Sequence, residues 1–456
     1  MGKYFGTDGF RGVAGKELTA IQAFRIGRFL GWYLKKERKK KIRAVIGKDT
    51  RLSSYMLEYA VASGLASSGA DSYILHVTTT PSVSYICKSD IFDIGIMISA
   101  SHNPYYDNGI KIITSDGKKL SDDISDKIEL YIDRDFKSLN LCDELPFEVG
   151  DQIGKIVDYY GGRNRYIGYL ISIAKSSFKS LKIGLDLSNG STHMIGKGVF
   201  SALGAKVISI NDTPNGTNIN ENAGSTSIEG LRRLVLEKGL DVGFAFDGDG
   251  DRCIAVDKSG EIIDGDKILY ILGRELKSQG ALMNDTIVTT VMSNLGLYRA
   301  LDEQGIKYEK TKVGDRFVYE CMSQNGYTLG GEQSGHIIIS KYATTGDGIL
   351  TAILLCESMV SSGKSLSELS CEVVLLPQLT TSISVKNKEA VLNNGAVKGE
   401  IKKVEKELEN VGRIMVRASG TEPKIRIMIE AEAKELCAEL TDRIVSKIKS
   451  EGLTNE

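Results

Sequence analysis

Three aspartates at alternate positions, Asp247, Asp249 and Asp251, form the group in this sequence that points most directly to chemistry. They lie in the stretch DGDGDR, separated only by glycines. Carboxylates this close repel one another unless a cation lies among them, and an all-oxygen ligand set favours Mg²⁺ or Ca²⁺. The stretch therefore predicts a metal site; the alternative is an aspartate-rich surface turn.

A calcium loop of the EF-hand type is disfavoured at two positions. Counted from Asp247, the sixth residue is Arg252, where that loop requires glycine, and the twelfth is Lys258, where it requires glutamate. Mg²⁺ usually retains water ligands and is completed by phosphate oxygens. We therefore expect Mg²⁺ here, next to a phosphorylated group.

Ser101 is the residue that could carry such a phosphate. It follows a short apolar segment, typical of a buried strand, in DIGIMISASHNP at 93–104. A hydroxyl can hold a phosphoryl group covalently and pass it on. Hydrolysis by Ser101 is disfavoured, because the chain has no GxSxG motif and the adjacent His102 is poorly placed as a base. The simpler alternative is a polar turn after a strand.

Two strands must position these groups. DIGIMI precedes the Ser101 loop and DVGFAF precedes Asp247, and both follow the pattern Asp, aliphatic, Gly, apolar. We interpret them as the same strand in two copies of one unit. Because open α/β sheets bind ligands beyond the carboxyl ends of their strands, the two loops are expected to face each other across a cleft.

Further polar loops complete the set of candidate residues. Arginine suits phosphate, glycine lets backbone amides approach a ligand, and a loop with hydroxyls and an arginine can hold a phosphate that does not react. Lys111 could neutralise charge or move a proton, and His336 titrates near neutral pH. The alternatives are tight turns, an exposed lysine and a structural histidine. The loops are GTDGFRG (6–12) with Arg11, GEQSGH (331–336) with Glu332, Ser334 and His336, and RASGTEP (417–423) with Arg417, Ser419, Gly420 and Thr421.

The surrounding sequence alternates strands and helices, which predicts right-handed βαβ crossovers and mainly parallel sheets. Thr19 and Gln22 form a capping box for a first helix that ends near 35–41. At 456 residues the chain exceeds one core of roughly 150 residues. We expect three related α/β domains with mixed, mainly parallel sheets (1–150, 151–252 and 253–372) and a smaller C-terminal α+β domain (373–456), around a central cleft. The last domain should contain a long charged helix near 388–409.

Composition limits the partners. The formal net charge is −1, so no overall field attracts nucleic acid or an anionic membrane. Seven scattered cysteines without a CxxC pair disfavour a zinc site and a disulfide scaffold. The N-terminus lacks an apolar signal region, and no apolar run approaches the roughly 18 residues of a membrane span. We therefore expect a cytoplasmic protein, as a monomer or homodimer, with a small-molecule partner.

Five motifs, in this order and across essentially the whole chain, resemble those of the α-D-phosphohexomutases: GTDGFRG, ISASHNP, DGDGDR, GEQSGH and RASGTEP. The resemblance implies an isomerase, an intramolecular phosphotransferase. The sequence Glu332-Gln333-Ser334 favours the branch acting on glucosamine phosphates, since the phosphomannomutase/phosphoglucomutase branch typically has Met in the middle. Ala418 departs from the proline that is frequent in this family, and we expect the phosphate contacts to be kept.

The resemblance also implies roles. Ser101 would be the phosphoserine and, with Asp247, Asp249 and Asp251, would hold one Mg²⁺ per subunit. A hexose 1,6-bisphosphate would be both the intermediate and the activator in the interconversion of glucosamine 6-phosphate and glucosamine 1-phosphate, which feeds amino-sugar and cell-wall precursor synthesis. The remaining roles are these: Arg11, His102, Lys111, Arg252 and His336 around the reacting phosphate, Glu332 and Ser334 on the sugar, and Arg417, Ser419, Gly420 and Thr421 on the distal phosphate.

Three other interpretations remain open. Within the family, a phosphomannomutase/phosphoglucomutase is the main alternative. FAFDGDGDR could also be the nucleophile motif of a haloacid-dehalogenase-like phosphatase, although that would leave SASHNP unexplained. A phosphosugar sensor without turnover is the third.

Overall fold

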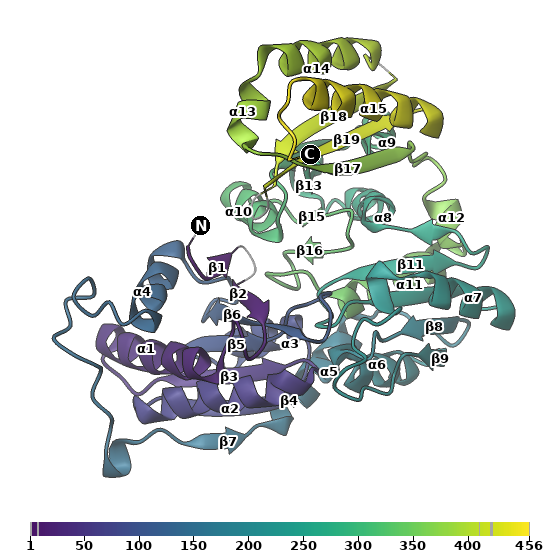
Figure 1. Ribbon diagram of the computed structural model, residues 1–456. Coiled ribbons are helices and arrows are strands. Elements are labelled where there is room, and N and C mark those ends of the chain that lie inside the picture. Colours follow the sequence, from purple (N-terminus) through teal and green to yellow (C-terminus); the bar gives the residue numbers. More distant parts are fainter. Residues whose placement is uncertain (1, 7–8, 410, 420–422, 456) are drawn as a thin grey trace. The chain divides into compact units, whose positions relative to one another are not determined.

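The structure, a computed structural model, describes residues 2–6, 9–409, 411–419 and 423–455. It divides into two compact units, Met1–Met292 with Ile306–Ser370 and Ser293–Gly305 with Cys371–Glu456. The first unit contains three mixed sheets, and the second contains one antiparallel sheet (Figure 1). Among the described residues, no helix combines the length and the apolar character needed to cross a membrane.

The first sheet has the strand order β1-β2-β6-β5-β3-β4-β7. Strands β5, β3, β4 and β7 are parallel, whereas β1, β2 and β6 form an antiparallel side that joins β5. The strands are β1 Phe5–Gly6, β2 Gly9–Val13, β3 Arg43–Lys48, β4 Asp71–Val77, β5 Ile94–Ile98, β6 Asp107–Thr114 and β7 Ile156–Asp158, and the helices are α1 Ala20–Arg38, α2 Leu52–Ser67, α3 Thr80–Ser89 and α4 Asp122–Ile132.

Burial on both faces explains why the strands of this sheet are continuously apolar. Ile96 and Ile98 of β5 pack into the core that includes residues of α1, α2 and α4, while Met97 packs into a second core with residues of α3. The predicted capping box of α1 is confirmed, since Thr19 Oγ1 accepts from the backbone of Gln22 and the Gln22 side chain accepts from the backbone of Thr19.

The second sheet has the order β12-β11-β10-β8-β9, with β10, β8 and β9 parallel. The sequence interpretation assigned 253–257 to the third domain, but β11 pairs antiparallel with β10 in this sheet. The reason is that DGDGDR makes a tight return rather than a crossover. The elements are β8 Lys182–Asp186, β9 Lys206–Ile210, β10 Val242–Phe246, β11 Cys253–Asp257, β12 Ile262–Ile263, α5 Tyr160–Ile173, α6 Gly196–Ala202 and α7 Glu229–Lys238.

The third sheet has the order β14-β13-β15-β16, and only the β15–β16 pair is antiparallel. That pair is a hairpin, and GEQSGH forms its connection. The elements are β13 Thr286–Thr290, β14 Lys307–Thr311, β15 Leu329–Gly331, β16 Ile337–Ile339, α8 Gly265–Ser278, α10 Asp315–Asn325, α11 Gly348–Ser362 and α12 Leu366–Leu369.

The second unit is built on the antiparallel order β17-β19-β18. The single helix expected near 388–409 is wrong: Asn394 has ψ 125° and breaks it, and the Asn394 side chain caps the second helix by accepting from the amides of Ala396 and Val397. The elements are α9 Leu295–Glu303, β17 Gln378–Ser384, α13 Lys388–Asn393, α14 Gly395–Glu407, β18 Gly412–Ala418, β19 Lys424–Ala431 and α15 Lys434–Ser450.

Segment Ser293–Gly305 is held to the C-terminal part of this unit by specific contacts. The amide side chain of Asn294 donates to the carbonyl of Leu376 and accepts from its amide, both at 3.0 Å. The amide of Leu295 donates to Glu430 at 3.1 Å. A Cβ on Gly296 would lie 2.0 Å from the carbonyl oxygen of Val374, so only glycine allows this approach. The second unit therefore has two discontinuous parts.

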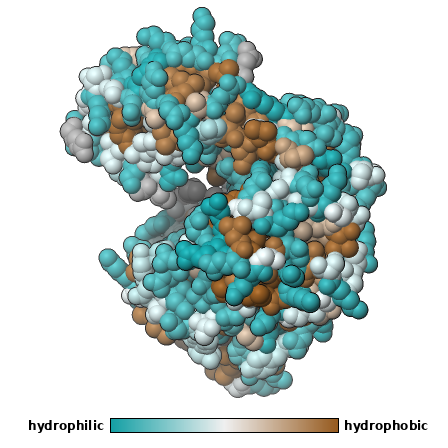
Figure 2. All heavy atoms as spheres, turned by 90° about the vertical axis from the view of Figure 1, so that its right-hand side faces the viewer, coloured by the Kyte–Doolittle hydropathy of each residue, from teal (hydrophilic) through white to brown (hydrophobic). Residues whose placement is uncertain are grey.

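The face drawn in Figure 2 is mostly hydrophilic, with smaller hydrophobic patches among the polar residues. This agrees with the position of the main apolar clusters inside the units. The predicted architecture of three α/β parts and a smaller α+β part is confirmed.

Candidate active site

Ser101 lies in the turn that leaves the carboxyl end of β5. Only 1% of its surface is exposed, and its backbone has φ 53°, in the left-handed region that residues other than glycine rarely adopt. Its Oγ donates to Oδ2 of Asp247 at 2.6 Å and lies 3.2 Å from Nδ1 of His102. The structure therefore brings together the serine and the aspartate stretch, as the sequence predicts.

The three aspartates form one buried cluster in the turn between β10 and β11. One carboxylate oxygen of each lies within 4.8 Å of the others. Oδ1 of Asp249 and Oδ1 of Asp251 are buried and have no hydrogen-bond partner among the described residues. Buried anionic oxygens without a donor are costly unless a cation is bound. The residues present therefore fit a divalent cation with oxygen ligands.

The charges around this cluster act on the three carboxyl groups differently. Burial raises the pKa of Asp247 well above its ordinary value, and the charges of Asp251 and Asp249 raise it further. Burial would also raise the pKa of Asp251, but Lys111, His336 and Arg252 lower it well below the ordinary range. Without a cation, Asp247 therefore binds a proton more readily than Asp251 does, and its ionised form is the costly one.

Lys111 of β6 lies against the same cluster. Its Nζ is 2.5 Å from Oδ2 of Asp249 and 3.5 Å from Oδ2 of Asp251. Thr80, the first residue of α3, also donates to Oδ2 of Asp249 through its hydroxyl. Both donors reach Oδ2 and leave Oδ1 of Asp249 for another ligand. Sequence reasoning missed Thr80, since a threonine at the start of a helix has no local signal for this contact.

Basic residues gather around His102. Burial and, to a smaller extent, the charges of Arg252 and Arg11 together lower the pKa of His102 to about 4. Arg11 of β2 lies opposite Gly109 of β6, and the backbone amide of Arg252 donates to Oδ1 of Asp247 at 3.1 Å. His102 is therefore neutral at pH 7, and the two arginines supply the positive charge beside Ser101.

His336 faces the cluster from the start of β16. Its Nδ1 lies 3.7 Å from Asp251 and its Nε2 lies 3.6 Å from Asp315. Burial alone would lower the pKa of His336, but the carboxylates of Asp251, Asp315 and Glu332 raise it to about 9. The amide of Gly346, 2.9 Å from Nε2, donates there only while that nitrogen carries no proton. This single neutral donor opposes ring protonation less strongly than the carboxylates favour it.

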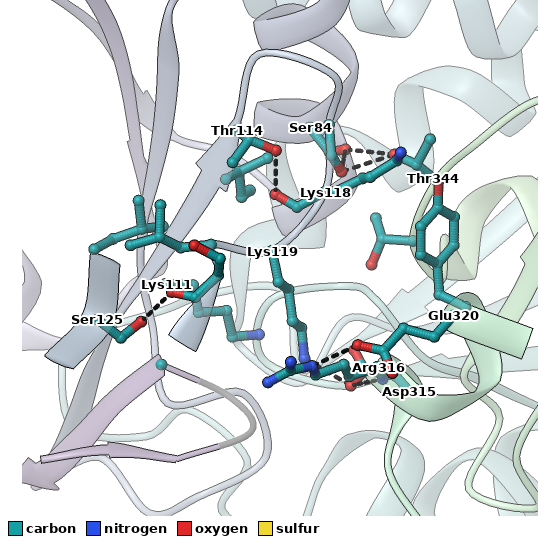
Figure 3. Close-up of a pocket in the computed structure, with 18 of the residues that line it drawn as sticks. Ser84, Lys111, Thr114, Lys118, Lys119, Ser125, Asp315, Arg316, Glu320 and Thr344 are labelled. Atoms are coloured by element: carbon teal, nitrogen blue, oxygen red, sulfur yellow. Dashed lines mark hydrogen bonds and ion pairs between the residues drawn. The ribbon is translucent and has the colours of Figure 1, made fainter. Parts of the chain in front are cut away.

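A pocket of about 990 Å³ opens beside these groups, and Lys111, Asp251 and His336 belong to its lining. In Figure 3, Lys119 from the segment after β6 extends to Asp315 at the start of α10, and the two charged groups are 2.6 Å apart. Arg316, next along α10, pairs with Glu320 at 2.7 Å. The pocket is thus bounded by charged groups from the segment after β6 and from α10, and Asp315 was not predicted.

The candidate sugar-binding loop is held by the side chain of Glu332 and by its own backbone. Oε1 of Glu332 accepts from the amide of Gly314 at 3.0 Å, and Glu332 is half-buried, whereas Ser334 is exposed. The carbonyl of Gln333 accepts from the amide of Gly265 at 3.0 Å. A Cβ on Gly265 would lie 2.0 Å from the carbonyl oxygen of Glu332, which explains the glycine at the start of α8.

The candidate phosphate loop belongs to the second unit. Arg417 on β18 lies directly across from Arg426 on β19, and burial followed by the charge of Arg426 lowers the pKa of Arg417. The Nζ of Lys388 donates to the carbonyl of Ser419 at 2.8 Å. Neighbouring cations favour an anionic ligand. Sequence reasoning missed Arg426 and Lys388, and its remaining candidates, Gly420 and Thr421, lie outside the described residues.

Comparison with known families assigns the chain to a class. Models of the four phosphoglucomutase/phosphomannomutase domains match it: α/β/α domain I at residues 2–138, domain II at 164–260, domain III at 264–374 and the C-terminal domain at 381–447. The chain therefore belongs to the phosphoglucomutase/phosphomannomutase family.

Relatives that match the chain over its full length carry the name of one particular member of this family. The phosphoglucosamine mutase of Lachnospira eligens is 56% identical over 453 residues, and that of Bacillus subtilis is 49% identical over 451 residues, each match covering 99% of both chains. Two solved structures share the fold. A phosphoglucomutase/phosphomannomutase family protein from Burkholderia thailandensis has a TM-score of 0.78 at 23% identity, over 98% of this chain and 97% of the other. Aspergillus fumigatus N-acetylphosphoglucosamine mutase, in complex with GlcNAc-6P and magnesium, has a TM-score of 0.71 at 17% identity, over 98% and 96%.

Proposed function

We propose that this protein is a phosphoglucosamine mutase, which interconverts glucosamine 6-phosphate and glucosamine 1-phosphate through a phosphorylated Ser101 and a 1,6-bisphosphate intermediate. The contact between Ser101 Oγ and Asp247 at 2.6 Å carries the proposal. It puts the hydroxyl that would bear the phosphoryl group at a cluster of three carboxylates. The names of the full-length relatives support the choice of substrate.

In the first transfer, the phosphoryl group moves from Ser101 to the sugar, and different residues act on it. The bond between phosphorus and Ser101 Oγ breaks, a bond between phosphorus and the free sugar hydroxyl oxygen forms, and the hydroxyl proton leaves. Lys111 and His336 are the candidates to move that proton, because both contact Asp251 beside the serine. His336 could accept it only from its neutral form, since its raised pKa favours the protonated ring. Arg11 and Arg252 stabilise negative charge on the transferred group, which is where most catalysis of phosphoryl transfer arises. The second transfer reverses these steps with the other phosphoryl group of the bisphosphate.

The aspartates would hold one Mg²⁺ per subunit, with an oxygen on Ser101 as a further ligand. When bound, this ion supplies positive charge that offsets the charge developing on the phosphoryl oxygens. The two buried oxygens without partners, on Asp249 and Asp251, support this assignment.

Substrate contacts complete the proposal. Glu332 and Ser334 would bind sugar hydroxyls, with His102 lining the reacting phosphate. The distal phosphate would meet Arg417, Ser419, Gly420 and Thr421, and the pairing of Arg417 with Arg426 supports an anion there. A hexose 1,6-bisphosphate would activate the enzyme by phosphorylating Ser101. We further propose a monomer or homodimer in the cytoplasm, a reducing compartment that suits the buried thiols of Cys87, Cys253 and Cys356.

The test follows the phosphate by ³¹P NMR. The protein is mixed with Mg²⁺, a trace of hexose 1,6-bisphosphate and the 6-phosphate of glucosamine, mannose or glucose in separate samples. Fastest conversion of glucosamine 6-phosphate to the 1-phosphate is expected. Faster conversion of mannose or glucose would keep the mechanism and reject the substrate. Release of inorganic phosphate alone would reject the mutase activity.

A further inference from the structure

The turn that carries Ser101 is held by several side-chain donors to its carbonyl groups. The turn runs from the end of β5 to the start of β6, and its serine keeps a left-handed backbone. Such a conformation persists where the surrounding structure determines it. The contacts that could do so come from two distant parts of the first unit.

Arg51, the residue before α2, provides the first set of contacts. The residue is fully buried, and each of its five side-chain N–H groups has an acceptor. Nε donates to Asp49 at 2.7 Å, which fixes the guanidinium within the first domain. The other acceptors are carbonyl oxygens of the turn: Ser101 and Asn103, each at 2.9 Å, Asp107 at 3.1 Å, and Pro104.

Asn220 provides the second set from a loop of the second sheet's domain. Its Nδ2 donates to the carbonyl of Ser101 at 2.9 Å and to that of Asn103 at 3.1 Å, although 119 residues separate Asn220 from Ser101. Asn220 itself has φ 59°, and its amide donates to the carbonyl of Ser188 at 2.9 Å. The carbonyls of Ser101 and Asn103 therefore each accept from one arginine and one asparagine.

The aspartate loop packs against the same point. A Cβ on Gly248 would lie 2.6 Å from the carbonyl oxygen of Ser101 and 3.0 Å from Nδ2 of Asn220. Glycine between Asp247 and Asp249 thus lets the aspartate loop approach the clamped carbonyl. The contacts of Arg51, Asn220 and Gly248 with the carbonyl of Ser101 therefore fix the position of the serine relative to Asp247.

We propose that Arg51 and Asn220 are positioning residues for phosphoryl transfer: by holding the carbonyl of Ser101 they keep its Oγ in reach of Asp247. The inference rests on the proposed function, in which Ser101 accepts the phosphoryl group. Neither side chain needs to touch substrate. Small displacements of a reacting atom cost large factors in rate, up to about 100-fold for about 1 Å.

Asn220→Gly is the variant that isolates this contact. Glycine accepts the left-handed backbone, so the substitution removes the two donors without adding strain. Asn211→Gly is a matched control, because Asn211 is also a left-handed asparagine of the same domain (φ 50°) whose side chain donates to Asp186 at 3.0 Å instead. Asn220→Asp serves as a second variant, which keeps the size of the side chain and replaces the donor by a carboxylate that repels the two carbonyl oxygens.

The first measurement is the rate at which glucose 1,6-bisphosphate phosphorylates Ser101 in the full-length protein with Mg²⁺, monitored by intact-protein mass spectrometry. The second is KM and kcat for glucosamine 6-phosphate. Both Asn220 variants are expected to phosphorylate Ser101 about 10- to 100-fold more slowly and to lose kcat at little-changed KM, whereas Asn211→Gly keeps the wild-type rate. A wild-type rate in Asn220→Gly, or an equal loss in Asn211→Gly, would overturn the inference alone. Wild-type protein that never acquires a phosphoryl group would overturn the proposed function and this inference with it.

Discussion

Oγ of Ser101 and Oδ2 of Asp247 are 2.6 Å apart, although 146 residues separate them in the chain. Each residue follows a buried strand, β5 or β10, and these strands belong to different sheets. The reacting hydroxyl and the proposed metal ligands therefore come from two domains and meet only in the folded chain.

Ser101→Ala should abolish mutase turnover, with a loss on the order of 10³-fold or more, because it removes the hydroxyl that carries the phosphoryl group in the proposed mechanism. The loss is measured in the ³¹P NMR assay. In parallel, mass spectrometry should detect a phosphoryl group on the wild type and none on the variant. Ser72→Ala, at another buried serine that does not line the pocket, provides a control. Full turnover by the Ser101 variant would contradict the phosphoserine mechanism.

Thr80→Val should weaken Mg²⁺ or Mn²⁺ binding by roughly 10- to 100-fold, since the hydroxyl of Thr80 orients the carboxylate of Asp249. Isothermal titration calorimetry measures the affinity. Thr78→Val is the matched control, because the Thr78 hydroxyl is also buried but donates to Ser82. Equal affinities in the two variants would show that the Thr80 contact does not support a metal ligand.

Asp247→Asn should have opposite effects on stability and activity. In chelator, one carboxylate fewer relieves the repulsion in the buried cluster, so the melting temperature should rise. The increase in melting temperature that Mg²⁺ gives the wild type should shrink, and turnover should be lost. Thermal unfolding with and without chelator measures both effects. A variant that melts lower than the wild type in chelator would argue against a repulsive cluster.

Asp93→Asn should make the stability of the first domain less dependent on pH. Burial alone would raise the pKa of Asp93, but hydrogen bonds from Lys40, the amide of Arg43 and Arg38 lower it below 3.8. A carboxyl group whose pKa is lowered in the folded state stabilises the protein at pH values above its unfolded pKa. This contribution to the free energy of unfolding is lost as the pH falls through the folded pKa. The variant should therefore lose about 1–3 kcal/mol at pH 7, and much less near pH 3.

Urea unfolding at the two pH values measures this difference. Asp151→Asn, at an exposed position, is the control and should leave the free energy of unfolding nearly unchanged at both. A loss in Asp93→Asn that is equally large at pH 3 would show that the ion pairs of Asp93 are not its source.

Arg417→Ala should lower kcat/KM by about 10- to 100-fold, mainly through KM, because a charged hydrogen bond to a phosphate that does not react contributes about 1.5–3 kcal/mol. Steady-state kinetics with glucosamine 6-phosphate measures the change. Arg443→Ala removes an arginine of the same unit that pairs with Glu400 and Glu407 on the surface. If Arg443→Ala lowers kcat/KM as much as Arg417→Ala does, Arg417 does not bind the distal phosphate specifically.

Sequence patterns predicted those site residues whose positions follow from the strands directly before them. Ser101 and the aspartates could be placed together because each ends a buried apolar strand, and ligand sites lie beyond such ends. Thr80, Asp315 and Asn220 could not be found in this way. Each acts through contacts with residues more than twenty positions away, and its own neighbours in the sequence carry no sign of them.

Two misassigned elements have a similar cause. The turn DGDGDR could lead either to a crossover or to a direct return, and only the pairing of β10 with β11 decides between them. Near Asn394 the charged pattern continues on both sides, so helical periodicity alone predicts one helix. The break depends on the side chain of Asn394, which satisfies the first amides of α14.

The division of the second unit into two parts also restricts how this chain could recombine with its relatives. An exchange of residues 371–456 alone would replace the partners of three resident residues. Asn294 forms paired hydrogen bonds with Leu376, the amide of Leu295 donates to Glu430, and Gly296 closely approaches the backbone of Val374. A chimera that also carries 293–305 would keep those contacts intact. The C-terminal part is therefore expected to be exchangeable only together with the short helix α9, which is encoded far upstream of it.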